Sequence, residues 1–212
     1  MKRISYLLFA LLITFSLTNC ADDGDPGPAG ADGTDGVDGV DGKDGVGFDE
    51  IAKYGGFMTY LDGIRPDDIA FKDTSNFKFV PIEYLSDRNI VTISGTRYSF
   101  NLQRFISAPD DVYQQAYSDL SLTVESGATP TFSNFSISIS KDIVTPDFKV
   151  FDMSNTFSSS NYTDLVIDNY SYTPSTGSLK FTFSFNVAGT SNATDNDLSV
   201  SGEVDAIVLQ QM

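Results

Sequence analysis

The sequence predicts an all-β fold for residues 48–212, an antiparallel β-sandwich or barrel of about eight to ten strands. The first observation is the segment from Leu179 to Val187, where apolar and polar residues alternate strictly, as in a strand with one buried face. The second is turn chemistry between such segments. Pro174-Ser175-Thr176-Gly177 is typical of a turn and predicts a hairpin between strands near 164–173 and 178–188.

Further alternating segments predict the other strands. They are Phe135–Ser140, Val91–Gly95, Tyr98–Leu102, Leu120–Val124 and Val200–Val208. One helix is predicted from Asp110 to Tyr117, where Pro109-Asp110 could begin it. The 165 residues from 48 to 212 are enough for one domain with a core, and this many strands must stack or close to bury one face each.

The first twenty residues have the plan of a signal peptide. Lys2 and Arg3 precede an apolar run from Ile4 to Leu17, which is shorter than the roughly twenty residues that a spanning helix needs. The sequence Leu17-Thr18-Asn19-Cys20 resembles the lipobox of bacterial lipoproteins, although Asn19 stands where that family usually has Gly, Ala or Ser. The resemblance implies cleavage after residues 1–19, lipid attachment at Cys20 and a membrane anchor of acyl chains. The alternative is an ordinary signal peptide with an incidental cysteine.

Residues 20–23 begin an acidic tether. The cluster Ala21-Asp22-Asp23-Gly24-Asp25 resembles the export signal behind the lipidated cysteine in surface lipoproteins of the Bacteroidota. This resemblance implies a secreted lipoprotein of the outer membrane, exposed on the cell surface. The alternative is that the aspartates only keep the tether solvated.

Residues 24–47 form a separate segment because glycine recurs at every third position from Gly24 to Gly45. This period resembles the collagen-like repeats of bacterial surface proteins, in which only glycine fits at the axis of a triple helix. Five consecutive triplets end in aspartate, which would stack rings of like charge in a trimer. Two hypotheses follow: a homotrimer through this segment, or an extended acidic spacer. The layout of stalk and β-rich head also resembles trimeric jelly-roll proteins of the tumour-necrosis-factor group.

The mature chain is strongly acidic. Without the signal peptide it has 11 basic and 29 acidic residues, a net charge of about −18. Phosphate backbones are bound by clustered lysine and arginine, so we expect no nucleic-acid partner.

Histidine is absent from the sequence, and its single cysteine is assigned to lipid. Ser-His-Asp and Cys-His catalysis and histidine-ligated zinc are therefore excluded. Paired carboxylates remain, such as Asp67-Asp68 and Asp110-Asp111, but solvated loop positions explain them better than a glycosidase pair. We expect no enzyme activity and no cofactor.

Two kinds of ligand site are candidates in the β-rich domain. Asp195 and Asp197 lie in a polar loop and are candidate calcium ligands, although a hydrophilic hairpin connection is the preferred interpretation. Tyr162, Tyr170 and Tyr172 could stack on a glycan, although we prefer a role in the core for them.

The sequence thus predicts an anchor, a spacer and a β-rich head without catalytic apparatus. The leading hypothesis is a non-enzymatic surface binding or adhesion module that engages a protein or a glycan. The alternatives are a structural or trimeric assembly subunit and, less favoured, a carboxylate-dependent hydrolase.

Overall fold

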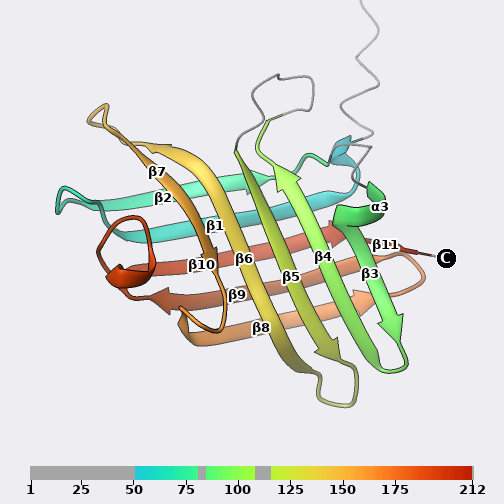
Figure 1. The fold of residues 1–212 in the computed structure, drawn as a ribbon. Helices are drawn as coiled ribbons and strands as arrows, with labels where there is room; N and C mark the ends of the chain where they lie inside the picture. The colour runs from blue at the N-terminus through green and yellow to red at the C-terminus, as the bar shows by residue number, and fades with distance from the viewer. Residues whose placement is uncertain (1–50, 81–84, 108–115, 212) are drawn as a thin grey trace, which may run out of the picture. The chain divides into compact units, whose positions relative to one another are not determined.

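The computed structural model describes residues 51–80, 85–107 and 116–211. These residues form a β-sandwich of two packed sheets, which confirms the predicted all-β class and decides between sandwich and barrel. In Figure 1 the strands of one sheet run behind those of the other and cross them at a large slant. Several predicted features lie outside the described residues: the predicted signal peptide, the predicted lipid attachment at Cys20, the predicted collagen-like segment and most of the helix predicted from Asp110 to Tyr117. Tyr117 itself begins a strand.

The five-stranded sheet joins strands from the two ends of the described chain. Its order is β2 (Ala70–Phe77), β1 (Gly55–Ile64), β10 (Leu198–Ile207), β9 (Ser178–Val187) and β8 (Thr163–Thr173). All of these pairings are antiparallel. Strand β1 lies between β2 and β10, so the first described strand is fixed in the interior of its sheet.

The six-stranded sheet is a meander with one short addition. Its order is β11 (Leu209–Gln210), β3 (Asn89–Ser94), β4 (Arg97–Phe105), β5 (Tyr117–Glu125), β6 (Thr131–Val144) and β7 (Val150–Phe157). The helix α3 (Leu85–Arg88) precedes β3, and the 3-10 helix η3 (Gly189–Ser191) lies in the β9–β10 loop. Strand β11 pairs in parallel with β3 and links the chain's last segment to this sheet.

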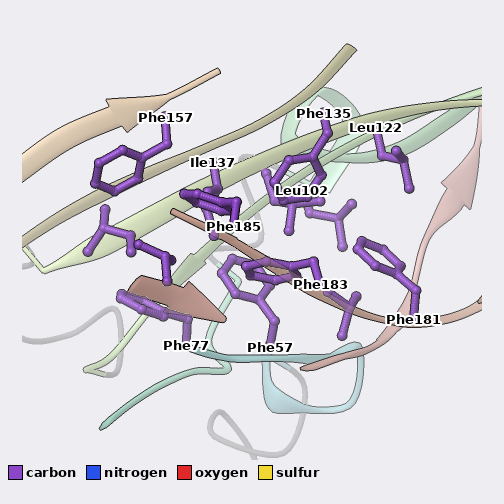
Figure 2. Packing of buried hydrophobic residues seen from close by; sticks show 14 of the residues in the cluster. Phe57, Phe77, Leu102, Leu122, Phe135, Ile137, Phe157, Phe181, Phe183 and Phe185 are labelled. Atoms are coloured by element: carbon purple, nitrogen blue, oxygen red, sulfur yellow. The ribbon is translucent and has the colours of Figure 1, made fainter. Parts of the chain in front are cut away.

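The core lies between the two sheets and is rich in phenylalanine. The alternation that predicts β9 has its physical basis here, because Phe181, Phe183 and Phe185 are buried while the residues between them face outward. From the opposite sheet, Phe135 of β6 meets the ring of Phe183 at 5.1 Å between centroids. Figure 2 shows these rings and those of β1, β2 and β7 filling the layer between the sheets. Each sheet thereby covers the apolar face of the other, and the opposite face of each sheet stays in contact with solvent.

The predicted strands and hairpin are confirmed, and four more strands appear that alternation did not indicate: β1, β2, β7 and the two-residue β11. The hairpin of β8 and β9 turns at Thr173–Ser178, as its turn residues predict. Strands β1, β2 and β7 contain charged or small residues at inward positions, such as Thr59 and Ser75, which weaken the apolar period. Their place in the sheets follows from pairing with neighbours and not from their own pattern.

A buried arginine connects the two sheets near the point where the chain enters the domain. Arg104 of β4 has no exposed surface, and its guanidinium donates to the carbonyl oxygens of Gly55 at 2.8 Å and Tyr54 at 3.3 Å, on the facing sheet's side. It also donates to the side-chain oxygen of Asn89 at 2.7 Å. Burial lowers the pKa of Arg104 to about 9, so the side chain keeps its charge at neutral pH.

Asn89 extends this connection across the sandwich. Its side-chain amide donates to the carbonyl oxygen of Ile207 at the end of β10, at 3.0 Å. One guanidinium and one amide therefore join β4 and β3 of the six-stranded sheet to the beginning of β1 and the end of β10. The carbonyl of Tyr54 also accepts from Ile207 N–H at 2.8 Å, so the two side chains add to a backbone contact between these segments.

We predict that Arg104→Met lowers the free energy of unfolding by about 3 kcal/mol or more. The substitution keeps the apolar length of the side chain and removes the donor to the carbonyl of Gly55 and to the side-chain oxygen of Asn89, each at a cost of about 1–3 kcal/mol. Denaturant unfolding measures the change. Arg88→Met is the matched control, because Arg88 is half exposed in its pair with Asp119, and it should cost no more than about 0.5 kcal/mol. Equal losses in the two variants would contradict the role of Arg104.

Candidate functional site

Two hairpin turns with related sequences lie at one end of the sandwich. The β1–β2 turn reads Ile64-Arg65-Pro66-Asp67-Asp68-Ile69-Ala70-Phe71, and the β6–β7 turn reads Val144-Thr145-Pro146-Asp147-Phe148-Lys149-Val150-Phe151. Both have the pattern Ile/Val-x-Pro-Asp-x-x-x-Phe. We call residues 65–69 and 145–149 the twin turns. In Figure 1 both hairpins project at the same end of the two sheets.

The twin turns have the same backbone geometry. In the first, Arg65 N–H donates to the carbonyl of Ile69 at 2.8 Å; in the second, Thr145 N–H donates to that of Lys149 at 2.9 Å. Proline begins each turn, where its fixed φ suits position i+1. The residue two places after each proline adopts a left-handed φ, +65° at Asp68 and +59° at Phe148. Glycine or asparagine is usual at such a position, so an aromatic side chain there is unusual.

Four charged side chains join the twin turns. Arg65 donates to Asp67 of its own turn at 2.8 Å and to Asp147 of the other turn at 2.6 Å. Lys149 in turn donates to Asp67 at 2.7 Å. We call Arg65, Asp67, Asp147 and Lys149 the ion cluster. Two positive and two negative charges cancel within it, although the molecule as a whole is strongly acidic.

Hydrogen bonding in the ion cluster shifts the ionisation of its members. Donation from Arg65, then from Lys149, lowers the pKa of Asp67 to about 2. Donation from Arg65, then from Thr145, lowers the pKa of Asp147 well below its usual range. Bonds to Asp147 and Asp67 raise the pKa of Arg65. Both carboxyl groups therefore stay ionised in mildly acidic solution.

The same pair of hairpins is joined along its length. Lys141 of β6 donates to both carboxylate oxygens of Asp73 on β2, at 2.8 and 2.9 Å, and both side chains are nearly buried. The rings of Phe71 and Phe151 meet edge to face at 5.1 Å. The edge strands β2 and β7 of the two sheets are thereby held together beside the twin turns.

Exposed apolar side chains gather around the twin turns. Phe148 is 95% exposed, Val144 is 72% exposed and Val150 is 64% exposed, and Val144 pairs with Val150 across the β6–β7 hairpin. Ile64 and Ile69 are exposed on the other hairpin. These five are the apolar tip. Among the described residues, only seven large apolar side chains have an exposed fraction of 38% or more. Five of these seven lie at one end of the domain.

The apolar tip lies at the end of the domain opposite to the chain's entry. Strand β1 begins at Gly55 beside Arg104 and runs ten residues to Ile64 at the first of the twin turns. At a rise of about 3.3 Å per residue, this strand separates the two ends by roughly 30 Å.

The candidate calcium ligands lie in the β9–β10 loop, which is stabilised by hydrogen bonds between its own residues. Asp195 adopts a left-handed φ of +57°, and the carboxylate of Asp197 accepts from Gly189 N–H at 3.2 Å. The amide of Asn196 donates to the carbonyl of Arg65 at 3.1 Å, which joins this loop to the first of the twin turns. Calcium binding by Asp195 and Asp197 stays a prediction.

The three tyrosines considered for glycan stacking contact the core. Tyr172 packs edge to face on Phe100 at 5.0 Å, and Tyr170 packs on Phe132 at 5.4 Å. Tyr162 lies 5.1 Å from the ring of Phe185. The preferred interpretation as core residues accounts for these contacts.

No protein-family model matches the chain, and no curated protein or solved structure is detectably similar to it.

Across residues 51–80, 85–107 and 116–211, no three histidine, cysteine or carboxylate side chains gather into a group that could hold a metal ion. In the same part of the chain, no helix has the length and apolar character needed to cross a bilayer. The described fold defines the class of the protein as an all-β sandwich.

Sequence reasoning missed the twin turns, although a signal for them was present. The shared pattern repeats at a spacing of 80 residues, from Pro66 to Pro146 and from Phe71 to Phe151. The sequence alone predicts a solvated loop pair at Asp67-Asp68. The structure places Asp68 in the turn and Asp67 in the ion cluster, so the pair does not act together.

We predict that the ion cluster stabilises the domain only where its carboxylates are ionised. Their pKa values are depressed in the folded state, so the contribution is complete above the unfolded value of about 3.9 and is lost as the pH falls toward about 2. Asp147→Asn should therefore lower the thermal midpoint at pH 7, and the difference from the natural chain should shrink below about pH 3.

The control is Asp205→Asn, which removes an exposed pair with Lys180. Exposed pairs contribute little, so this variant should resemble the natural chain at both pH values. If the thermal midpoint of Asp147→Asn differs from that of the natural chain by the same amount at every pH, the side chain of Asp147 stabilises the domain through its shape and not through its charge.

Proposed function

We propose that this protein is a non-enzymatic surface binding or adhesion module that engages a protein partner through the apolar tip. The observation that carries the proposal is the gathering of five exposed apolar side chains at one end of a domain whose described residues expose only two other large apolar side chains, Val166 and Ile207. Contiguous exposed apolar residues mark interaction sites in soluble proteins. Aromatic residues at such positions are frequent anchors in interfaces.

The conformation of Phe148 supports an external role for its ring. Its left-handed φ disfavours a bulky side chain, and its 95% exposure removes any contribution to the core. Neither local backbone preference nor packing accounts for phenylalanine at this position. An uncommon backbone state combined with an exposed aromatic ring is typical of positions that serve binding.

Charge compensation beneath the tip supports the same proposal. Docking removes water from the groups around an interface, and an isolated charge there is costly to desolvate. Within the ion cluster each carboxylate already accepts from a base of the same cluster. The tip can therefore be covered by a partner at a lower electrostatic cost than the other acidic surfaces of the molecule.

The proposal includes the expected attachment to the outer membrane through acyl chains at Cys20, with residues 24–47 as spacer. Because the chain enters the domain at the end opposite to the tip, attachment on that side would leave the tip free to meet a partner. The protein would then act as a tethered, outward-facing head.

The binding proposal is tested with Phe148→Asn. Asparagine tolerates a left-handed φ better than phenylalanine, so the thermal midpoint should stay unchanged or rise. An array of secreted and cell-surface proteins, probed with the full-length chain, should show partners whose binding weakens about tenfold or more in the variant. If Phe148→Asn keeps its thermal midpoint and loses binding, the loss is caused by the missing ring and not by unfolding.

The matched control is Ile207→Ser, which removes another exposed apolar side chain at the end of β10. It should leave binding to the array unchanged. If the natural chain binds no protein, or if Phe148→Asn and Ile207→Ser bind equally well, the tip is not the contact surface.

The anchor is tested separately with Cys20→Ala in the expressing bacterium. Without the thiol there is no site for acyl chains, and the protein should move from the membrane fraction to the soluble fraction. Fractionation followed by immunoblotting measures this. Cys20→Ala protein that stays with the membrane would mean that another segment holds the chain there.

A further inference from the structure

The outer face of the five-stranded sheet contains a continuous groove that the proposed function does not use. Three adjoining hollows of about 520, 270 and 440 Å³ lie along it. Tyr60, Ser184 and Ser201 line both the first and the second hollow, and Asn186 and Ser199 line both the first and the third. Because they share these residues, we treat the three hollows as one surface and call it the outer groove.

Strand register explains why the face is hollow. Tyr60 of β1 pairs with Ser201 of β10, and Ser201 pairs with Ser184 of β9. One row across three strands thus places an aromatic ring next to two of the smallest polar side chains. The next row places Asp62 beside Ser199 and Asn186. Small polar side chains in the middle and longer ones at the sides leave a depression whose lining mixes polar and apolar groups.

The charges of the outer groove restrict its ligand. Its lining includes a single lysine, Lys72, and six carboxylates: Asp62, Asp73, Asp164, Asp168, Asp197 and Glu203. The lysine is paired with Asp62 at 2.7 Å, so it offers no free positive charge. Anionic ligands such as phosphates or uronic-acid polymers are therefore repelled.

Hydrogen-bonding groups of the groove suit a ligand with many hydroxyl groups. Carboxylates accept strong bonds from hydroxyl donors, and serine and asparagine side chains both donate and accept. Glu203 already accepts from the hydroxyl of Tyr60 at 3.3 Å, which holds the half-buried ring at the centre of the groove. A sugar ring offers an apolar face for an aromatic side chain and hydroxyl groups around its edge.

We propose that the outer groove binds a neutral oligosaccharide, with Tyr60 against the face of one sugar ring and Asn186, Asp62 and Asp164 bonding to hydroxyl groups. Asn186 and Asp164 are already in contact, at 3.3 Å between the amide nitrogen and the carboxylate oxygen, so they form a joint polar end of the first hollow. This site is separate from the apolar tip. It holds or fails independently of the proposed function.

The groove lies on strands and not on long loops, which favours a preformed site. Its central residues belong to β1, β9 and β10, whose inner faces carry buried apolar residues of the core. Little conformational entropy is then lost when a ligand binds. A shallow groove open along its length accommodates a chain of sugars better than a single small molecule.

Titration calorimetry of the full-length chain with cellohexaose, maltohexaose and mannohexaose tests the proposal. At least one of these neutral oligosaccharides should bind, and Tyr60→Ala should weaken that binding about tenfold or more. Tyr60→Phe keeps the ring and should retain most of the affinity. Ser201→Leu fills the centre of the groove and should abolish binding, with the thermal midpoint showing that each variant is folded.

Phe148→Asn serves as the control at the other surface and should bind the same oligosaccharide as the natural chain does. The proposal is overturned if none of the three oligosaccharides binds, or if Tyr60→Ala binds as well as the natural chain. It is also overturned if oligogalacturonate or an oligolysine peptide competes for the groove more strongly than the neutral sugars, because the ligand class would then be charged.

Discussion

Two arginine side chains, one at each end of the sandwich, fix how the two sheets lie on each other. Arg104 joins β4 to the carbonyls of Tyr54 and Gly55, and Arg65 joins the β1–β2 turn to Asp147 of the β6–β7 turn. The apolar core between them is rich in phenylalanine, but hydrophobic contact has no preferred direction. Guanidinium groups bond only in a planar fork, so they select one placement of the sheets among the many that the core would accept.

This placement creates the two surfaces for which we propose binding. At the Arg65 end it brings together two hairpins that are separated by 80 residues, and their exposed apolar residues become one tip. Within the five-stranded sheet, the pairing of β1 with β10 sets Tyr60 beside Ser201 and opens the outer groove. The edge strand β8 carries two register shifts and left-handed residues at Asp164 and Asn169, which discourage pairing with another chain's strand.

The two surfaces differ in chemistry and suit different ligands. The tip is apolar above a charge-compensated cluster, whereas the groove is hydroxyl-rich and lined by carboxylates. They are also neighbours, because the β9–β10 loop bonds to the carbonyl of Arg65 through Asn196 and contributes Asp197 to the third hollow. A head with both surfaces could hold a saccharide and contact a protein on the same target, as glycoproteins would offer.

The sequence by itself determined the all-β class and the strands whose alternation is strict, such as β6 and β9, because a half-buried strand requires apolar residues at every second position. It also determined the excluded chemistries, since a chain without histidine has no imidazole base wherever it folds. Only the tertiary structure decided that Tyr60 lies in a groove while Tyr170 and Tyr172 pack on the core, although all three are strand tyrosines. The same holds for Phe148, because phenylalanine is usually a core residue and this side chain is almost fully exposed to solvent. Alternation states which residues share a face of a strand, whereas the face that meets the other sheet is chosen by pairing and packing between segments far apart in the chain.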